Sequence, residues 1–382
     1  MLVRPRTAAA YPVVLLLLWA GAALALLTLA DGHGGYDLEI YRGALRSWLD
    51  GGALYDYAHP GDSRQLGFTY PPFGALVLAP LAVLPAAAAS LAHAVTGAVA
   101  LVVALRVVLG DRGWYAGWRG VAVALPIALL LEPVRDSFGF GQVNLQLAAL
   151  VVGDLVLLRR GSRGAGVGIG LATAVKLTPA LLLVHLLVCG RRRAALTGAA
   201  VAGGATLLAA VVAPATSRDF WGSALRDTSR VGSADSPSNQ ALSGLIARLF
   251  ERASPPTAVW LVAVGVVVVA GLWRARAADR DGDDLAGLTL AGVTALLISP
   301  ISWIHHLWWV IPAVAVLLHA RTRRALAAAV CLVVVFASSL PDLVRVPLEE
   351  HRSSVATVVG ESVLCLALLA VLVRLPYRPK ST

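Results

Sequence analysis

Residues 86–109 read AAAASLAHAVTGAVALVVALRVVL, a long run of apolar side chains. The run contains no acidic residue, and its single basic residue, Arg106, lies near the C-terminal end. It exceeds the about 20 apolar residues that a helix needs to cross the hydrocarbon core of a membrane. The stretch therefore predicts a transmembrane helix, and the chain on either side of it is interpreted as part of a membrane protein.

Further apolar segments lie on both sides of this run, separated by short polar stretches. They cover residues 11–30, 73–84, 121–131, 145–158, 166–175, 177–188, 194–212, 258–273, 285–298, 307–318, 325–340 and 355–373. Several are shorter than a full span, which is typical of broken or re-entrant helices that are shielded inside a protein. We predict an all-α, polytopic integral membrane protein, a single domain over residues 1–382, with about 12 transmembrane helices.

The composition favours the same fold class. Of the 382 residues, 58% are hydrophobic and 14% are charged, and the mean hydropathy is +0.75. Soluble globular chains average about 45–50% apolar and about 25% charged residues. This excess of apolar residues excludes a soluble enzyme, a disordered chain, and a large soluble domain on a single membrane anchor.

The basic residues indicate how the chain is oriented. The net charge of +10 comes from arginine clusters between apolar segments, a pattern that excludes a nucleic-acid partner. Cytoplasmic loops of membrane proteins are enriched in such clusters. This rule places residues 321–324, 274–280, 191–193, 159–163 and the tail inside, and residues 176, 214–256, 300–306 and 342–352 outside. We expect a multi-pass protein among the lipids of the plasma membrane, with both termini inside.

The first polar stretch, residues 31–70, is an outer loop in this topology. Within it, residues 37–49 carry apolar side chains three or four positions apart, which predicts an amphipathic helix in the membrane interface. Asp37 begins that helix, directly after a glycine pair and a tyrosine. An aspartate in this position is a candidate general base, and the alternative is a simple N-cap of the helix.

Several polar or aromatic side chains flank predicted helices on the outer side. Tyr70, in the segment FTYPP, is a candidate wall of a binding site or an interface anchor. Gln142 and Asn144, in GQVN, and Asn239 and Gln240, in SNQ, precede apolar segments. Amides are good partners for sugar hydroxyls, so these residues are candidate ligands of a sugar or an acceptor. Helix capping is the alternative, for Asn144 as well as for the later pair.

Lys176 is one of two lysines in the chain, and it separates two apolar segments in LATAVKLTP. A lysine at membrane depth is costly and usually faces a cavity or a partner. The next helix is expected to start near Thr178 and Pro179, and helix N-termini attract anions. A phosphate fits both features, and a lysine that extends to the membrane surface is the alternative.

The stretch 299–309, SPISWIHHLWW, combines histidines with tryptophans at the outer interface. Trp303 fits the aromatic belt and is also a candidate apolar platform for a sugar. His305 and His306 point about 100° apart on a helix, so they are poor joint metal ligands. We expect one of them to face a cavity and to bind phosphate or a hydroxyl. The three cysteines show no metal-binding spacing, and neither a metal nor a cofactor is predicted.

Taken in order, the motifs YDLEIYR, FTYPP, GQVN, LATAVKLTP, SNQ and SPISWIHHLWW resemble those of glycosyltransferase family 87. The resemblance covers nearly the whole chain. It implies a GT-C-type transmembrane bundle and a polyprenyl-phosphate-linked mannose donor, or in some branches decaprenyl-phosphate arabinose. It also implies that Asp37 is the catalytic base, and that Lys176 lines the pocket of the donor phosphate together with His306 or its neighbour His305.

The function that this resemblance implies is inverting α-mannosyl transfer on the extracytoplasmic side. Asp37 is expected to deprotonate a hydroxyl of a lipid or glycan acceptor, while Lys176 and a histidine stabilise the leaving phosphate. Arabinosyl transfer is the alternative within the family, and a lipid or sugar transporter is the alternative outside it. The polar residues gather at one face and no inverted repeat is evident, which favours the enzyme. The sequence identifies neither the acceptor nor the oligomeric state.

Overall fold

The computed structural model describes residues 15–24, 34–60, 66–110, 117–348 and 354–377. Within these ranges the secondary structure is helical, apart from an isolated β-bridge between Asn239 and Trp303. Three described helices are long and apolar enough to cross a membrane, namely α4 (Ala86–Leu109), α10 (Arg192–Val212) and α13 (Thr257–Arg280). The fold is therefore all-α, with the long apolar helices of a membrane protein.

The remaining helices are shorter, and most of them coincide with the other predicted apolar segments. They are Leu15–Leu24, α2 (Tyr36–Leu49), η1 (Leu54–Asp56), α3 (Pro72–Val83), α5 (Gly117–Leu130), α6 (Glu132–Phe140), α7 (Asn144–Arg159), α8 (Val167–Val175), α9 (Ala180–Val188), α11 (Pro214–Asp219), η2 (Phe220–Ala224), η3 (Thr228–Val231), α12 (Leu242–Leu249), α14 (Asp284–Ile298), η4 (Ile304–Trp309), α15 (Val310–Ala320), α16 (Arg323–Ala337), α17 (Leu340–Leu348), α18 (Val355–Glu361) and α19 (Val363–Arg374). The rest of the predicted first helix, and the residues just after it up to His33, lie outside the described residues. The total of about 12 membrane crossings stays a prediction.

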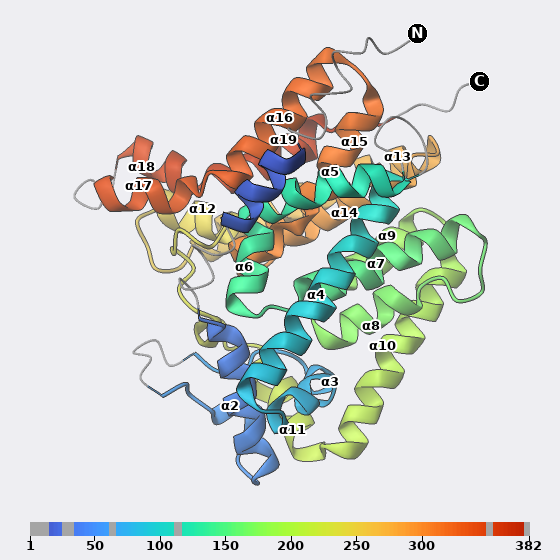
Figure 1. Ribbon diagram of the computed structural model, residues 1–382. Coiled ribbons are helices and arrows are strands. Elements are labelled where there is room, and N and C mark those ends of the chain that lie inside the picture. The colour runs from blue at the N-terminus through green and yellow to red at the C-terminus, as the bar shows by residue number, and fades with distance from the viewer. Residues whose placement is uncertain (1–14, 25–33, 61–65, 111–116, 349–353, 378–382) are drawn as a thin grey trace.

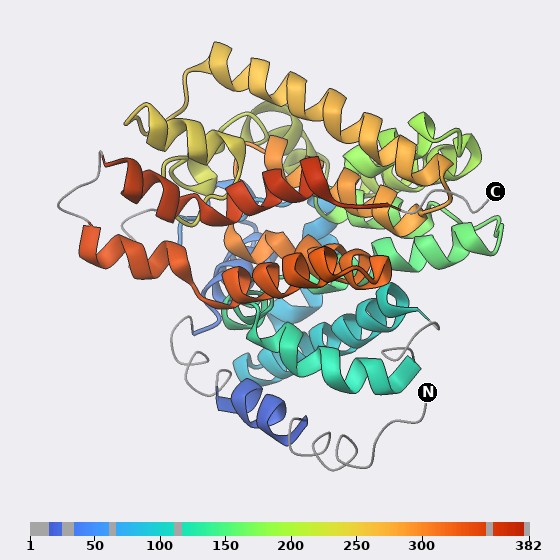
Figure 2. The ribbon, with the colours of Figure 1, turned by 90° about the horizontal axis from the view of Figure 1, so that it is seen from above.

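The centre of the bundle is α14, in which every residue from Leu285 to Leu297 is buried. It packs against α9, α13, α15 and α19. Glycines allow this close packing, because a side chain at Gly271 would collide with Thr294 and one at Gly292 would collide with the Trp309 ring. Small residues at helix contacts are the usual way to bring transmembrane helices together. Figure 2 shows α13, α19 and the α15–α16 hairpin crossing the view in roughly the same direction.

The amphipathic helix predicted over residues 37–49 is present as α2. It gathers with α3 and α11 at the lower end of Figure 1. Arg42 and Arg46 extend from α2 and donate hydrogen bonds to the carbonyl oxygens of residues 81, 82 and 84. These carbonyls end α3 and have no partner within that helix, so the two arginines cap α3 and fix α2 against it.

Ion pairs join the ends of several helices, α7 with α14 and the start of α10 with α13. Arg159, at the end of α7, makes two hydrogen bonds of 2.8 and 2.7 Å to Asp284, at the start of α14. Arg191, just before α10, contacts Asp279 of α13 at 2.7 Å. Three of the basic clusters used for the topology, at residues 159–163, 191–193 and 274–280, are therefore connected at one end of the bundle.

The last apolar segment differs from the sequence-based expectation of one helix over residues 355–373. The structure breaks it at Ser362 into α18 and α19, which are bent by 69° relative to each other. The break is stabilised from a distant loop, because Gln240 donates to the oxygen of Glu361 and accepts from the nitrogen of Cys365. Arg248 adds a hydrogen bond of 3.0 Å to the Ser362 hydroxyl. These contacts satisfy backbone groups that an apolar environment cannot.

Candidate active site

Asp37 lies in the first turn of α2, not at its N-cap. The N-cap is Gly35, with a φ of 73°, so the alternative that Asp37 caps the helix is wrong. Its Oδ2 atom instead accepts a hydrogen bond of 2.5 Å from Nε2 of Gln142, a residue 105 positions away. The carboxylate is therefore connected to the segment between α6 and α7.

Gln142 also contacts two tyrosines. Its Nε2 lies 2.8 Å from the Tyr41 hydroxyl, and its Oε1 accepts a hydrogen bond of 2.7 Å from the Tyr70 hydroxyl. The two hydroxyls are themselves 2.8 Å apart. Burial raises the pKa of Tyr41 and of Tyr70 above the usual value of a phenol, so both remain protonated and can donate.

The local backbone explains how Gln142 reaches Asp37. Gly141 follows the last turn of α6 with a φ of 76°, a conformation that glycine adopts without strain. A side chain at Gly141 would also collide with Leu38, the neighbour of Asp37 on α2. Both the backbone conformation and the close contact therefore require glycine at this position of the motif FGQVN. The glycine lets α2 approach closely enough for the Gln142 amide to reach the Asp37 carboxylate.

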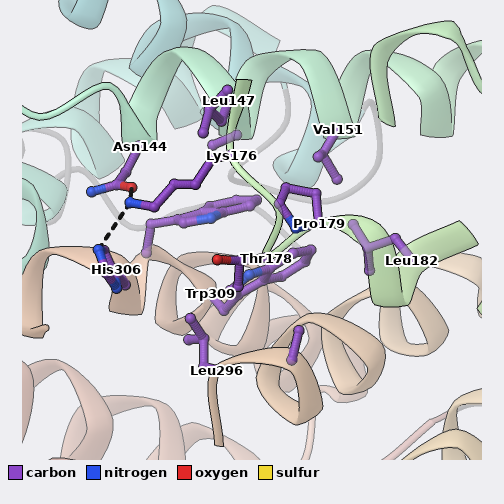
Figure 3. A pocket seen from close by; sticks show the side chains of 13 residues that line it. Asn144, Leu147, Val151, Lys176, Thr178, Pro179, Leu182, Leu296, His306 and Trp309 are labelled. Atoms are coloured by element: carbon purple, nitrogen blue, oxygen red, sulfur yellow. Dashed lines mark hydrogen bonds between the residues drawn. The ribbon is translucent and has the colours of Figure 1, made fainter. Parts of the chain in front are cut away.

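Lys176 lies between α8 and α9 and makes contacts with two other predicted site residues. Its Nζ donates to Oδ1 of Asn144 at 2.9 Å and lies 2.9 Å from Nε2 of His306. Figure 3 shows the lysine extended between these two side chains. The same Nζ is 5.1 Å from the centre of the Tyr70 ring. Tyr70 thus contacts both the Lys176 group through its ring and the Asp37 group through its hydroxyl.

A cavity of about 50 Å³ opens beside Lys176. Lys176, Asn144 and His306 form one end of it, while Val151, Pro179 and Leu182 lie at the other end (Figure 3). The rest of the lining is also mainly apolar and comprises Leu147, Ala148, Thr178, Ala295, Leu296, Trp308 and Trp309. Such a cavity suits a ligand with a charged head and an apolar chain.

The two histidines of the late loop have different environments. His306 lines the cavity and contacts Lys176. His305 is 6% exposed and its ring lies 5.6 Å from that of Phe140, on the side of α6. Asn144 donates to the backbone oxygen of His305 at 3.1 Å, so the loop is held against α7 at this point. The alternative left open by the sequence is thus resolved geometrically towards His306 as the lysine's partner.

Asn144 is the first residue of α7 and the N-cap is Val143, so the capping alternative for Asn144 is wrong. Its side chain bridges Lys176 and the late loop. Trp303 is half-buried and pairs through its backbone with Asn239, and it does not line the cavity.

Asn239 and Gln240 are fully buried and away from the cavity. Asn239 accepts hydrogen bonds from the backbone nitrogens of Ala241 and Ser302. Gln240 holds the break between α18 and α19. Ala241 is the N-cap of α12, so the capping alternative is wrong for both residues. Their role as sugar ligands stays a prediction.

Tyr41 is a member of the site that the sequence did not single out. It lies one helical turn after Asp37, and residues four positions apart share a face of a helix. The spacing could have indicated that Tyr41 lies near Asp37 in the site. However, an aromatic residue on the apolar face of an amphipathic helix is equally explained by packing. Trp308 and Trp309 both lie in the cavity wall. From the sequence, like Trp303, they fit the aromatic belt and are also candidate apolar platforms for a sugar.

Known proteins resemble this chain over most of its length. The model of glycosyltransferase family 87 matches residues 68–300. A polyprenol-phosphate-mannose-dependent alpha-(1-2)-phosphatidylinositol mannoside mannosyltransferase of Mycobacterium tuberculosis is 35% identical, over 79% of this chain and 75% of its own. Its namesake in Mycolicibacterium smegmatis is 36% identical, over 84% and 78%.

A third relative, also from Mycolicibacterium smegmatis, is a polyprenol-phosphate-mannose-dependent alpha-(1-2)-phosphatidylinositol pentamannoside mannosyltransferase. It is 32% identical, over 76% of this chain and 70% of its own. The family model matches well over half of the residues, and the matched range contains Lys176 and its polar partner Asn144. The chain therefore belongs to glycosyltransferase family 87 and is a membrane glycosyltransferase.

Proposed function

We propose that this chain transfers mannose from a polyprenyl-phosphate-mannose donor to a hydroxyl of a lipid or glycan acceptor, with inversion at the anomeric carbon. The observation that carries the proposal is the position of Lys176, Asn144 and His306 at one end of an otherwise apolar cavity. A polyprenyl phosphate has the matching chemistry, because its phosphate is anionic and its chain is a hydrocarbon. The names of the relatives support mannose as the sugar.

The leaving phosphate is stabilised by the polar end of the cavity. Lys176 supplies a positive charge, while Asn144 and His306 hold it in place and offer further hydrogen-bond partners. Fixed charges and donors that face the developing charge usually contribute most to catalysis. Because the leaving phosphate already carries its charge, the donor bond breaks without a strong acid to protonate it.

Asp37 acts as the general base in this proposal. It accepts the proton of the acceptor hydroxyl as that oxygen attacks the anomeric carbon from the face opposite the phosphate. One displacement of this kind converts a β-linked donor into an α-linked product. Tyr70 contacts the groups of both Asp37 and Lys176, which supports assigning the two chemical roles to neighbouring groups. The region before Tyr70, residues 31–70, then forms the outer loop that carries the base.

The two ends of α7 support an extracytoplasmic location of the site. Asn144 begins this helix of 16 residues and Arg159 ends it, which separates them by about 24 Å along the axis. The arginine clusters lie at the Arg159 end, together with Asp284. Since such clusters prefer the cytoplasmic side, the Asn144 end and the cavity face the other side of the membrane.

The test uses purified protein in lipid nanodiscs with radiolabelled polyprenyl-phosphate-mannose. A membrane lipid extract is the first acceptor, and phosphatidylinositol mannosides follow because the relatives are named for them. We expect transfer of label by the wild type and loss of it in Asp37→Asn. Transfer from decaprenyl-phosphate arabinose alone would replace mannose by arabinose in the proposal. Movement of labelled lipid across the bilayer without any transfer would overturn the enzyme in favour of a transporter.

A further inference from the structure

The hydrogen bonds among Tyr41, Tyr70 and Gln142 form a closed ring with a defined direction. Tyr70 donates its proton to Oε1 of Gln142, so the Tyr70 oxygen is an acceptor in its contact with Tyr41. Tyr41 therefore donates to Tyr70, and its own oxygen accepts from Nε2 of Gln142. Each member of the ring donates once and accepts once.

This ring leaves one amide proton of Gln142 for Asp37. An amide nitrogen carries two protons, of which one points to Tyr41 and the other to Oδ2 of Asp37. Rotation of the amide by 180° would place its oxygen against the carboxylate, which can only accept, while the two hydroxyls could turn and close the ring in the opposite direction. The carboxylate thus sets which end of Gln142 faces it, and the two tyrosines hold the amide in place through its other hydrogen bonds.

The ring is buried and is assembled from three parts of the chain. Tyr41 and Gln142 are each 5% exposed and Tyr70 is 3% exposed. Tyr41 belongs to α2, Tyr70 precedes α3, and Gln142 lies between α6 and α7. Hydrogen bonds that point the same way around a ring strengthen one another in such a low-dielectric setting. The donor to Asp37 is therefore held more rigidly than a single glutamine on the surface would be.

We propose that Gln142 is a positioning residue for Asp37, and that Tyr41 and Tyr70 hold the Gln142 side chain at the place from which it donates to the carboxylate. The inference rests on the proposed function of Asp37 as the general base. It replaces the role of sugar ligand that the sequence suggested for Gln142 and Tyr70. The bond from Gln142 favours the charged form of the carboxylate and fixes the direction in which it accepts a proton.

The first test compares Gln142→Leu with the wild type, with kcat, KM for the donor, and pH dependence as readouts. Leucine fills similar space without a donor. We expect kcat to fall about 10- to 100-fold while KM for the donor stays the same, because the donor phosphate site is separate. The acid limb of the pH–rate profile is expected to shift to higher pH, since the ionised carboxylate loses a stabilising donor. A merely structural role would lower the amount of active enzyme without moving the profile.

The second test uses Tyr41→Phe, Tyr70→Phe and the double variant, which remove one or two hydroxyl oxygens and keep the buried aromatic rings. If the ring acts as one unit, the double variant loses no more activity than the worse single variant. Tyr57→Phe is the matched control, because Tyr57 is a half-buried tyrosine of the same outer loop that does not belong to the ring. We expect it to keep wild-type kcat and an unchanged pH profile.

The outcomes separate this inference from the proposed function. Wild-type activity with an unmoved pH profile in Gln142→Leu and in both tyrosine variants would overturn the positioning role, provided that Asp37→Asn is inactive. A rise of KM for the acceptor alone would restore the role of sugar ligand. Full activity of Asp37→Asn would instead overturn Asp37 as the base, and with it the foundation of the inference.

Discussion

The Nζ atom of Lys176 lies 2.9 Å from Nε2 of His306, a contact between two groups that can both carry positive charge. An ammonium has three donors and no acceptor, so a charged Lys176 requires His306 to accept at Nε2. The histidine is then neutral and carries its proton on Nδ1. Oδ1 of Asn144 accepts a second hydrogen bond from the ammonium, at 2.9 Å. When Lys176 is protonated, the pair therefore presents one positive charge, held by neutral partners, to the apolar cavity.

Lys176→Met is expected to weaken binding of the donor phosphate. Methionine has a similar length and no charge, so the cavity keeps its shape while the charge-assisted bond is lost. Such bonds contribute about 1.5–3 kcal/mol, which corresponds to about 10- to 100-fold in affinity. Competition between polyprenyl phosphate and a labelled donor analogue on the purified protein measures this. Arg160→Gln, which removes an exposed cation at the other end of α7, is the control and should bind normally. Equal affinities of Lys176→Met and wild type would remove Lys176 from the phosphate site.

Asp37→Asn is expected to lower kcat about 10²- to 10⁴-fold and to leave donor binding intact, because a base acts on the acceptor proton during the reaction. The measurement is the turnover of label at saturating donor. Glu39→Gln is the matched control, since Glu39 is an exposed acid in the same first turn of α2. If both variants lost activity equally, the negative charge of the helix start would matter more than Asp37 as a base. Loss of donor binding together with kcat would give Asp37 a structural role.

The helices could be predicted from the sequence far better than the partners of the polar residues. The length of an apolar run is local information, so residues 86–109 match α4 and residues 285–298 match α14 to within one residue. The partner of a polar side chain is not local. Gln142 lies just before a helix and its residue type suggests a sugar ligand, yet its partner Asp37 lies 105 positions earlier. Only the packing of α2 against the end of α6, which Gly141 permits, brings the two together.

The sequence alone suffices to select Asp37, Lys176 and one histidine as candidate site residues, because charged or polar side chains stand out next to apolar segments. The sequence cannot predict which of the two histidines contacts the lysine. Side chains of adjacent residues point in different directions, and those directions depend on the backbone conformation of the loop. The structure shows η4 as a 3₁₀ helix with non-helical angles at Leu307. Its irregular path sends His306 towards Lys176 and His305 towards Phe140.

We expect His306→Ala to affect donor binding and His305→Ala to affect stability. Removal of His306 deprives Lys176 of a partner at the cavity, so KM for the donor should rise several-fold with little change in thermal stability. Removal of His305, which is buried against Phe140, should lower stability and leave KM unchanged, because a cavity forms in a packed region. Thermal unfolding in detergent and donor titrations measure the two effects. The reverse assignment would show that the late loop rearranges when the donor binds.

Gln240→Leu tests whether this buried amide serves the fold instead of the sugar. Its side chain satisfies the oxygen of Glu361 and the nitrogen of Cys365, two backbone groups freed by the break in the last apolar segment. Leucine leaves both without a partner, and each buried unsatisfied group costs about 1–3 kcal/mol. We therefore expect a clear drop in the midpoint of thermal unfolding, with unchanged KM for donor and acceptor in the fraction that remains folded. Gln146→Leu, which alters a half-buried amide on α7, is the control and should unfold close to the wild type. A raised KM for the acceptor with normal unfolding would return Gln240 to the sugar site, and would mean that α18 and α19 move apart from the loop during the reaction.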